Sequence, residues 1–213
     1  MRLPRFGSLR ARADLAVENA RLRRRIEFLE LTDPTTGLLH ARAFDAALLD
    51  VVRSAIARSL PAALVVIDVD GFAALALDHG HAAAEDALRA LATSIRAHFG
   101  DRATYGRVGY DRFGAALPDT IVAEAYARAE RLRRDAADAA TIGAEPITVT
   151  LSAGVAGYPD DASTAVSLLA ACARAASGAM RAGGNVVQAA GTHLAAQNGR
   201  ASSSATSREG KRI

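Results

Sequence analysis

One continuous apolar run, Ala63–Ile67, most constrains how this chain can fold. It lacks polar alternation, which is typical of a strand covered by helices on both faces. The run ends in Asp68 and Asp70, and Gly71 follows. Carboxylates at the end of a buried strand often bind a ligand or a metal in α/β proteins. Alternatively, Asp70 caps the next helix and nearby backbone satisfies Asp68. The run predicts an α/β protein and leaves both interpretations of the carboxylates open.

The composition favours one cytoplasmic domain with appendages. The 213 residues suit one domain, and the 50% hydrophobic content is ample for a core. The net charge of +3 is small, and its basic excess lies at the two ends, which favours solvated ends over a nucleic-acid site. The single cysteine, Cys172, excludes an internal disulfide framework and should be a small core residue. We expect no membrane span, no secretory signal and no nucleic-acid partner.

The N-terminal segment shows heptad spacing. Leu15, Leu22 and Leu29 lie seven residues apart. Asn19 and Ile26 fill the alternate positions of the same stripe, and a polar residue at one such position tends to fix a parallel two-stranded register. Because the heptads are few, a single amphipathic helix docked on its own domain is the alternative. We predict a coiled-coil-type helix that forms a homodimer.

Helix-breaking residues and changes of pattern along the chain predict three segments and an order of secondary-structure elements. The segments are an N-terminal helix (1–30), a folded domain (31–190) and a disordered polar and basic tail (191–213). The expected helices cover 40–59, 83–99, 120–140 and 164–181, with a loop at 79–81. The expected strands cover 63–67, a hairpin at 103–117, a half-buried or edge strand at 147–155, and 186–187. In the first helix, the positions expected to face the core are Phe44, Leu48, Val51 or Val52, and Ile56.

The hairpin carries a polar tip within Arg107–Phe113. Glycine tolerates positive φ, so Gly109 before Tyr110 indicates a turn between two strands. The tip also places Asp111 directly beside Arg112. Such a tip is either an ordinary turn or a loop that presents side chains to a ligand.

Five ordered blocks resemble the GGDEF (diguanylate cyclase) family over about residues 31 to 190. The blocks are Leu31–Leu38; Ile67–Phe72 with Gly80, His81 and Glu85; Arg107–Phe113 with Leu117 and Pro118; Val149–Val155; and Gly183–Val187. The resemblance implies an α/β (α+β) fold of the nucleotidyl-cyclase-like kind, with a central, mostly antiparallel sheet flanked by helices. Enzymes of this family join two GTP molecules into cyclic di-GMP across a homodimer, with Mg²⁺.

The resemblance assigns roles to several residues. Asp68 matches the metal-binding aspartate, and Asp111 matches the acidic third residue of the namesake motif, with a catalytic and metal-binding role. Glu85 stands at the position of an acid that reads guanine. The remaining implied nucleotide-binding positions are Gly71, Phe72 and Ala73, whose turn can offer N–H groups to phosphate, and Gly109.

The positions that depart from the family pattern outnumber those that match it. In the motif Gly109-Tyr110-Asp111-Arg112-Phe113, Tyr110 replaces a glycine and should crowd the site, and Arg112 replaces an acidic residue. We expect Arg112 to occupy the volume of the lost metal and to pair with Asp68 or Asp111. Further departures are Ala76 at a guanine-binding position, Ala73, Met180 and Gly184 at phosphate-binding positions, and Gly100 and Ala103 in the inhibitory site, which we expect to be absent.

These departures predict a non-catalytic, degenerate GGDEF domain. Loss of one preorganised electrostatic group typically lowers a rate by about a hundredfold to a thousandfold, and several losses compound. We expect a dimeric signalling or interaction module linked to cyclic di-GMP signalling, with a protein partner that the sequence does not name. No cofactor is expected, except Mg²⁺ if nucleotide binding remains. The alternatives are a weakly active cyclase that uses Asp68, Asp111 and Glu85, and a sensor that binds GTP weakly without turnover.

Overall fold

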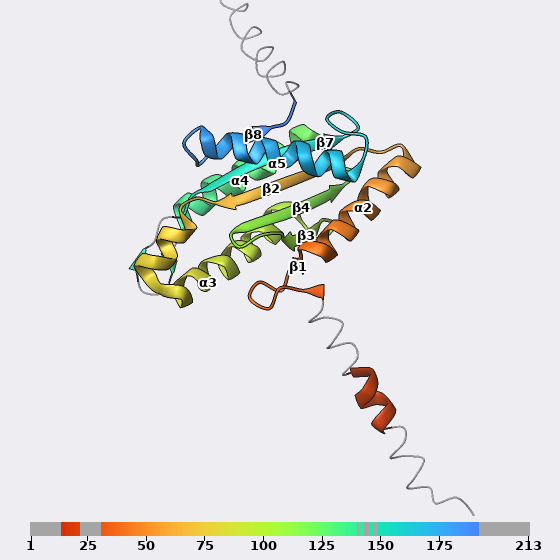
Figure 1. The fold of residues 1–213 in the computed structure, drawn as a ribbon. Coiled ribbons are helices and arrows are strands. Elements are labelled where there is room, and N and C mark those ends of the chain that lie inside the picture. Colours follow the sequence, from red (N-terminus) through yellow and green to blue (C-terminus); the bar gives the residue numbers. More distant parts are fainter. Residues whose placement is uncertain (1–13, 22–30, 140, 143–144, 147–148, 192–213) are drawn as a thin grey trace, which may run out of the picture.

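The computed structural model describes residues 14–21, 31–139, 141–142, 145–146 and 149–191 (Figure 1). The labelled helices are α2 (Ala41–Arg58), α3 (Phe72–Phe99), α4 (Val122–Ala139) and α5 (Ala165–Arg181). The strands are β1 (Leu39–His40), β2 (Ala62–Val69), β3 (Thr104–Arg107), β4 (Arg112–Pro118), β5 (Thr141–Ile142), β6 (Glu145–Pro146), β7 (Leu151–Tyr158) and β8 (Val187–Ala189). Among these residues, no helix is both long and apolar enough to cross a membrane.

A six-stranded sheet forms the centre of the domain, in the order β1-β3-β4-β2-β7-β8. The inner pairs β3–β4, β4–β2 and β2–β7 are antiparallel. The outer pairs β1–β3 and β7–β8 are parallel. The prediction of a mostly antiparallel sheet flanked by helices is therefore confirmed.

Helices cover both faces of the sheet, so the apolar run in β2 is buried throughout, as predicted. Leu64 and Val66 belong to the core cluster that contains residues of α2 and α5. Val65 and Ile67 point the other way, into the cluster that contains residues of α3 and α4. Figure 1 shows α2 and α5 on the near side of the sheet and α4 behind it.

Small residues let α5 lie directly on β7. A Cβ added to Gly154 would stand 2.2 Å from the carbonyl oxygen of Cys172 and 2.3 Å from the amide nitrogen of Ala176, so only glycine fits. Cys172 itself is fully buried, and its Sγ lies 3.0 Å from the Gly154 carbonyl oxygen. This confirms that the only cysteine is a small core residue.

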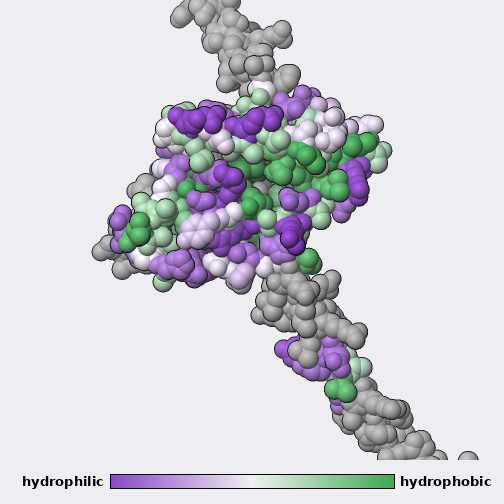
Figure 2. Space-filling model, in the orientation of Figure 1, coloured by the Kyte–Doolittle hydropathy of each residue, from purple (hydrophilic) through white to green (hydrophobic). Residues whose placement is uncertain are grey.

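The near face of the domain also exposes apolar side chains. Leu49 on α2 and Val166 on α5 are 39% and 80% exposed. Figure 2 shows apolar area to the right of centre on this face, next to a strongly polar region.

The predicted coiled coil lies mostly outside the described residues. Residues 14–21 are helical, Leu15 and Asn19 are both exposed, and the Asn19 side chain donates a hydrogen bond to the Leu15 carbonyl oxygen. Leu22, Ile26 and Leu29 fall outside the described part, as do residues 192–213 of the expected tail. The dimer, the disordered tail and the three-segment division remain predictions.

Three expectations about local structure were wrong. The strand expected at 147–155 as half-buried or at an edge is β7, which is buried between β2 and β8. The alternation in the sequence comes from Thr148, Thr150 and Ser152. Of these, only Ser152 lies in β7, where it is fully buried. Ile56 is 49% exposed, while Val52 and Ala55 face the core.

The helix expected to begin near residue 83 begins at Phe72. Residues 79–81 form a kink rather than a loop, because Gly80 alone leaves helical geometry, with φ 85° and ψ 166°. Glycine adopts this conformation without the steric cost that a side chain would add. The helix therefore continues on both sides of the kink.

Candidate functional site

The candidate site lies where three strand ends meet, at the C-terminal end of β2. Because β4 and β7 both run antiparallel to β2, their first residues lie beside its last ones. Asp68 is the direct register partner of Arg112 on one side and of Ser152 on the other. The N-terminus of α3 follows two residues after β2.

Asp68 forms an ion pair with Arg112. The Nε of Arg112 lies 2.6 Å from the Oδ1 of Asp68, and the Asp68 side chain is 5% exposed. Its Oδ2 is buried and has no hydrogen-bond partner among the described residues. Burial raises the pKa of Asp68 above its usual range, the Arg112 guanidinium opposes this rise, and the charges of Asp111 and Asp70 add to it. The expected pairing of Arg112 with Asp68 is confirmed, and the alternative that backbone satisfies Asp68 is wrong.

Asp70 anchors the neighbouring segments instead of capping α3. Gly71 takes the N-cap position and supplies no side-chain hydrogen bond. The Asp70 carboxylate accepts hydrogen bonds from the hydroxyls of Thr150 (2.9 Å) and Ser152 (2.6 Å) and from the backbone N–H of Asn185 (2.8 Å). The capping interpretation was therefore wrong, and Asp70 ties β2 to β7 and to the loop before β8.

The hairpin turn spans residues 108–111 between β3 and β4. The N–H groups of Val108 and Gly109 donate to the Arg112 carbonyl oxygen, at 2.9 and 3.2 Å. Gly109 does not use the positive φ that its type allows. A Cβ there would lie 3.1 Å from the Cβ of Arg112, so glycine instead provides room beside that side chain.

The hairpin tip is closed against β2 and α3. The Val69 N–H donates to the Asp111 carbonyl oxygen at 3.0 Å. The rings of Tyr110 and Phe72 meet edge to face, with centroids 5.2 Å apart and planes at 73°. The Asp111 side chain makes no hydrogen bond to the described residues, although its charge acts on Asp68. The tip is thus held by backbone and by an aromatic contact.

Arg107 joins this tip to the segment before α2. Its Nη1 lies 3.2 Å from the Oδ2 of Asp33, and its Nε and Nη2 donate to the Tyr110 carbonyl oxygen. Both side chains of the ion pair are mostly buried. Burial raises the pKa of Asp33, but the Thr36 hydrogen bonds and Arg107 together hold it below its usual value.

Several predicted site residues lie together and others do not. Gly71 and Phe72 begin α3 next to Asp68, and Ala73 is exposed at the same helix end. Phe113 is a fully buried core residue. Glu85 pairs with Arg89 on its own helix at 3.6 Å, and the structure gives it no contact with the strand-end site.

Sequence reasoning missed two features. The first is the Asp70 network, whose Thr150 and Ser152 lie in the block Val149–Val155 but reach Asp70 only through strand pairing. The second is the Asp33–Arg107 ion pair. The only hint of this ion pair in the sequence was that two motif blocks carry residues of opposite charge.

The residues at the strand ends do not fit a magnesium ion. Mg²⁺ prefers carboxylate and other oxygen ligands in octahedral geometry. Here the guanidinium of Arg112 already binds the Asp68 carboxylate. Among the described residues, no group of three or more His, Cys, Asp or Glu side chains is placed to hold a metal.

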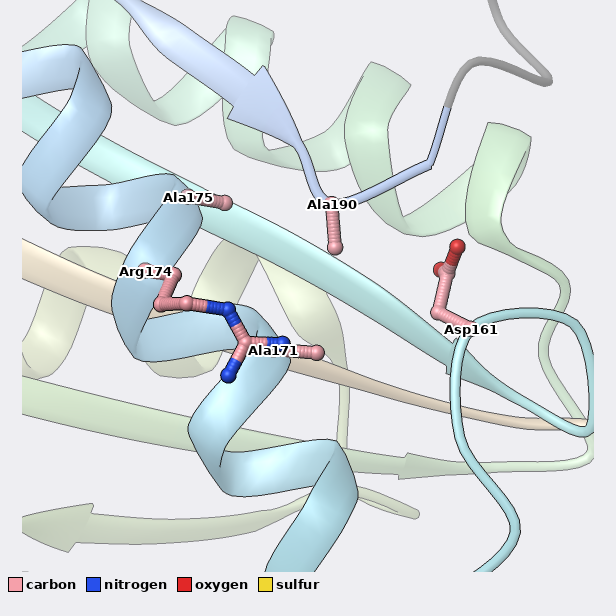
Figure 3. A pocket seen from close by; sticks show the side chains of 5 residues that line it. All are labelled: Asp161, Ala171, Arg174, Ala175 and Ala190. Carbon is pink, nitrogen blue, oxygen red and sulfur yellow. The ribbon is translucent and has the colours of Figure 1, made fainter.

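Two pockets lie elsewhere on the domain. One of about 240 Å³ lies beside α5 and is lined by Asp161, Ala171, Arg174, Ala175 and Ala190 (Figure 3). The other, of about 390 Å³, includes Gly100 and Ala103. Four of its charged lining residues are paired with one another, since Arg102 binds Asp119 and Arg128 binds Glu124.

The fold is a sheet between two pairs of helices. Acidic residues lie at the end of its central strand, beside a hairpin tip. This arrangement defines a nucleotidyl-cyclase-like domain. The family described as "Diguanylate cyclase, GGDEF domain" matches residues 30–186. The chain belongs to this family, which confirms the resemblance.

Two curated relatives are similar to this chain over its folded domain. The bifunctional diguanylate cyclase/cyclic di-GMP phosphodiesterase MucR of Pseudomonas aeruginosa is 30% identical over 155 residues, which cover 73% of this chain and 23% of MucR. The response regulator PleD of Caulobacter vibrioides is 29% identical over 144 residues, which cover 66% of this chain and 32% of PleD. The chain thus spans between 23% and 32% of the length of these relatives.

Solved structures agree with the fold. The coiled coil and GGDEF domain of DgcB from Caulobacter crescentus, in complex with c-di-GMP, is 25% identical, covers 85% of this chain and 99% of that one, and has a TM-score of 0.75. The GGDEF domain of FimX from Pseudomonas aeruginosa is 28% identical, covers 74% of this chain and 98% of that one, and has a TM-score of 0.69.

Proposed function

We propose that this protein is a non-catalytic GGDEF domain that acts as a dimeric signalling or interaction module in cyclic di-GMP signalling. The ion pair between Arg112 and Asp68 carries the proposal. Asp68 matches the family's metal-binding position, and a guanidinium on that carboxylate repels a divalent cation. Without the metal, the charge that develops during phosphoryl transfer lacks its main stabiliser.

The position of Tyr110 supports the same conclusion. Its ring contacts Phe72, in the turn whose N–H groups would otherwise face phosphate. Tyr110 stands where the family has a glycine, so a bulky side chain replaces a position without one. Its side chain is 57% exposed and thus lies at the surface of the site. Ala76, Met180 and Gly184 further reduce the set of groups that can bind guanine and phosphate.

Family membership and the heptad spacing of the N-terminal sequence support the proposed module role. The relatives MucR and PleD are named as a diguanylate cyclase/phosphodiesterase and a response regulator. We assign this chain to the same signalling context and propose that its N-terminal heptads form the dimer contact. Its protein partner then binds a folded domain that has lost turnover.

A product assay tests the proposal. The full chain is incubated with GTP and either Mg²⁺ or Mn²⁺, and cyclic di-GMP is measured by mass spectrometry. We expect no product above the protein-free background. Product that scales with protein concentration would favour a weakly active cyclase, and Asp111→Ala should then abolish it.

A second candidate is a sensor that binds GTP without turnover. It is favoured by Gly71, which keeps a left-handed turn (φ 66°) and supplies no side-chain cap to the first N–H groups of α3. Such groups attract phosphate. Calorimetry with GTP distinguishes the sensor from the interaction module. The sensor requires measurable GTP binding, whereas the module needs none.

A further inference from the structure

We propose that Arg112 is an internal counter-cation that takes the place of a divalent metal at Asp68, so that this strand end binds no divalent metal ion. This inference rests on the site used for the proposed function. It concerns metal binding, however, and not catalysis.

Backbone register places the guanidinium. Asp68 and Arg112 are directly opposed in the antiparallel pairing of β2 with β4. Side chains of directly opposed residues project from the same face of a sheet, about 5 Å apart at Cβ. Strand pairing therefore places the Arg112 side chain within reach of the Asp68 carboxylate. An acidic residue at position 112 would face Asp68 in the same way and would require an external cation.

Burial favours a counter-cation beside an ionised Asp68. The Asp68 side chain is 5% exposed, and no group in the described part of the chain forms a hydrogen bond with its Oδ2. A buried carboxylate that lacks a counter-charge strongly destabilises a fold. Asp70 and Asp111 add negative charge nearby. Among the described side chains, Arg112 is the one cation that contacts Asp68.

The hairpin tip is held by contacts that do not involve the Arg112 guanidinium. Asp111 is already bound through its carbonyl oxygen to Val69, and Tyr110 already contacts Phe72. The Asp111 carboxylate remains without a hydrogen bond to the described residues. Removal of the guanidinium would leave Asp68 and Asp111 as neighbouring oxygen donors, which is the chemistry that Mg²⁺ and Mn²⁺ prefer.

The test compares the full chain with Arg112→Ala and Arg112→Glu in the presence and absence of Mn²⁺. Arg53→Ala is the matched control, because it removes an exposed arginine whose ion pair with Asp50 spans 3.7 Å. The wild type and Arg53→Ala should show no Mn²⁺-dependent change in Tm. Both Arg112 variants should gain a rise of about 5 °C or more with saturating Mn²⁺. Adding Asp68→Asn to Arg112→Glu should abolish that rise.

A Mn²⁺-dependent rise in the wild type would overturn the inference, as would its absence from both folded Arg112 variants. If a variant does not fold alone, its refolding yield is compared with and without Mn²⁺. Recovery that needs Mn²⁺ supports the inference, and equal yields overturn it. Cyclic di-GMP production by the wild type would overturn the proposed function, whereas Mn²⁺ binding by an inactive wild type would overturn this inference alone.

Discussion

Asp33 and Arg107 form a mostly buried ion pair, with Nη1 and Oδ2 3.2 Å apart, although 74 residues separate them in the chain. The same guanidinium also donates to the Tyr110 carbonyl oxygen. One cation therefore links the segment before α2 to the tip of the hairpin at the candidate site.

Replacing Asp33 should destabilise the domain. Asp33→Ala leaves Arg107 without its carboxylate and removes the hydrogen bonds to Thr36, so we expect a loss of about 2–4 kcal/mol in the free energy of unfolding. Asp50→Ala, at an exposed ion pair, should change it by less than about 0.5 kcal/mol. Urea unfolding measures both, and equal effects would contradict the role of the buried pair.

The contribution of Asp33 should depend on pH. Burial raises the pKa of Asp33, but Thr36 and Arg107 hold the net value below the ordinary 3.8. A lowered pKa in the folded state gives stability that is present above the ordinary value and lost as pH falls through the folded one. The difference in unfolding free energy between wild type and Asp33→Asn should therefore be largest at neutral pH and shrink below about pH 4. A difference that stays constant between pH 7 and pH 3 would contradict the assignment.

Asp70 should matter more for stability than the neighbouring Asp111. Asp70→Ala removes the acceptor for Thr150, Ser152 and the Asn185 N–H, and Ser152 is fully buried. We expect a loss of about 2–4 kcal/mol in unfolding free energy. Asp111→Ala is the local control, since its side chain makes no hydrogen bond to the described residues. Thermal unfolding of both variants checks this, and the opposite ranking would exclude Asp70 as an anchor.

The thiol of Cys172 should be unreactive in the folded protein. Cys172 lies on α5, fully buried where this helix packs on β7, and burial raises the pKa of its thiol far above the ordinary value. Because the thiolate is the reactive form, a thiol reagent such as DTNB should label Cys172 only after denaturation. Rapid labelling of the native protein would show that α5 does not pack on β7 as described.

The central strand and the elements of the site could be predicted from local patterns. Ala63–Ile67 is apolar on both faces, and this alone indicates a covered strand. The hairpin and the carboxylates at the end of that strand lie within the motif blocks. The pairing of Arg112 with Asp68 could be anticipated because both positions belong to matched blocks of one family.

The features that could not be predicted depend on contacts between segments that are distant in the sequence. Asp70 looked like a helix cap, because its true partners Thr150 and Ser152 are placed beside it only by the pairing of β2 with β7. The strand β7 looked half-buried or at an edge because Thr148, Thr150 and Ser152 alternate with apolar residues, whereas Ser152 is fully buried and donates to Asp70. The continuation of α3 through Gly80 likewise depends on packing on both sides of the kink.

The central claim is that this GGDEF domain has lost cyclase activity, and its most direct test is product formation by the purified full chain. GTP is supplied with Mg²⁺ and, separately, with Mn²⁺, beside an active diguanylate cyclase as positive control. The account predicts no cyclic di-GMP above background with either metal. Cyclic di-GMP that accumulates in proportion to protein concentration and disappears in Asp111→Ala would contradict it.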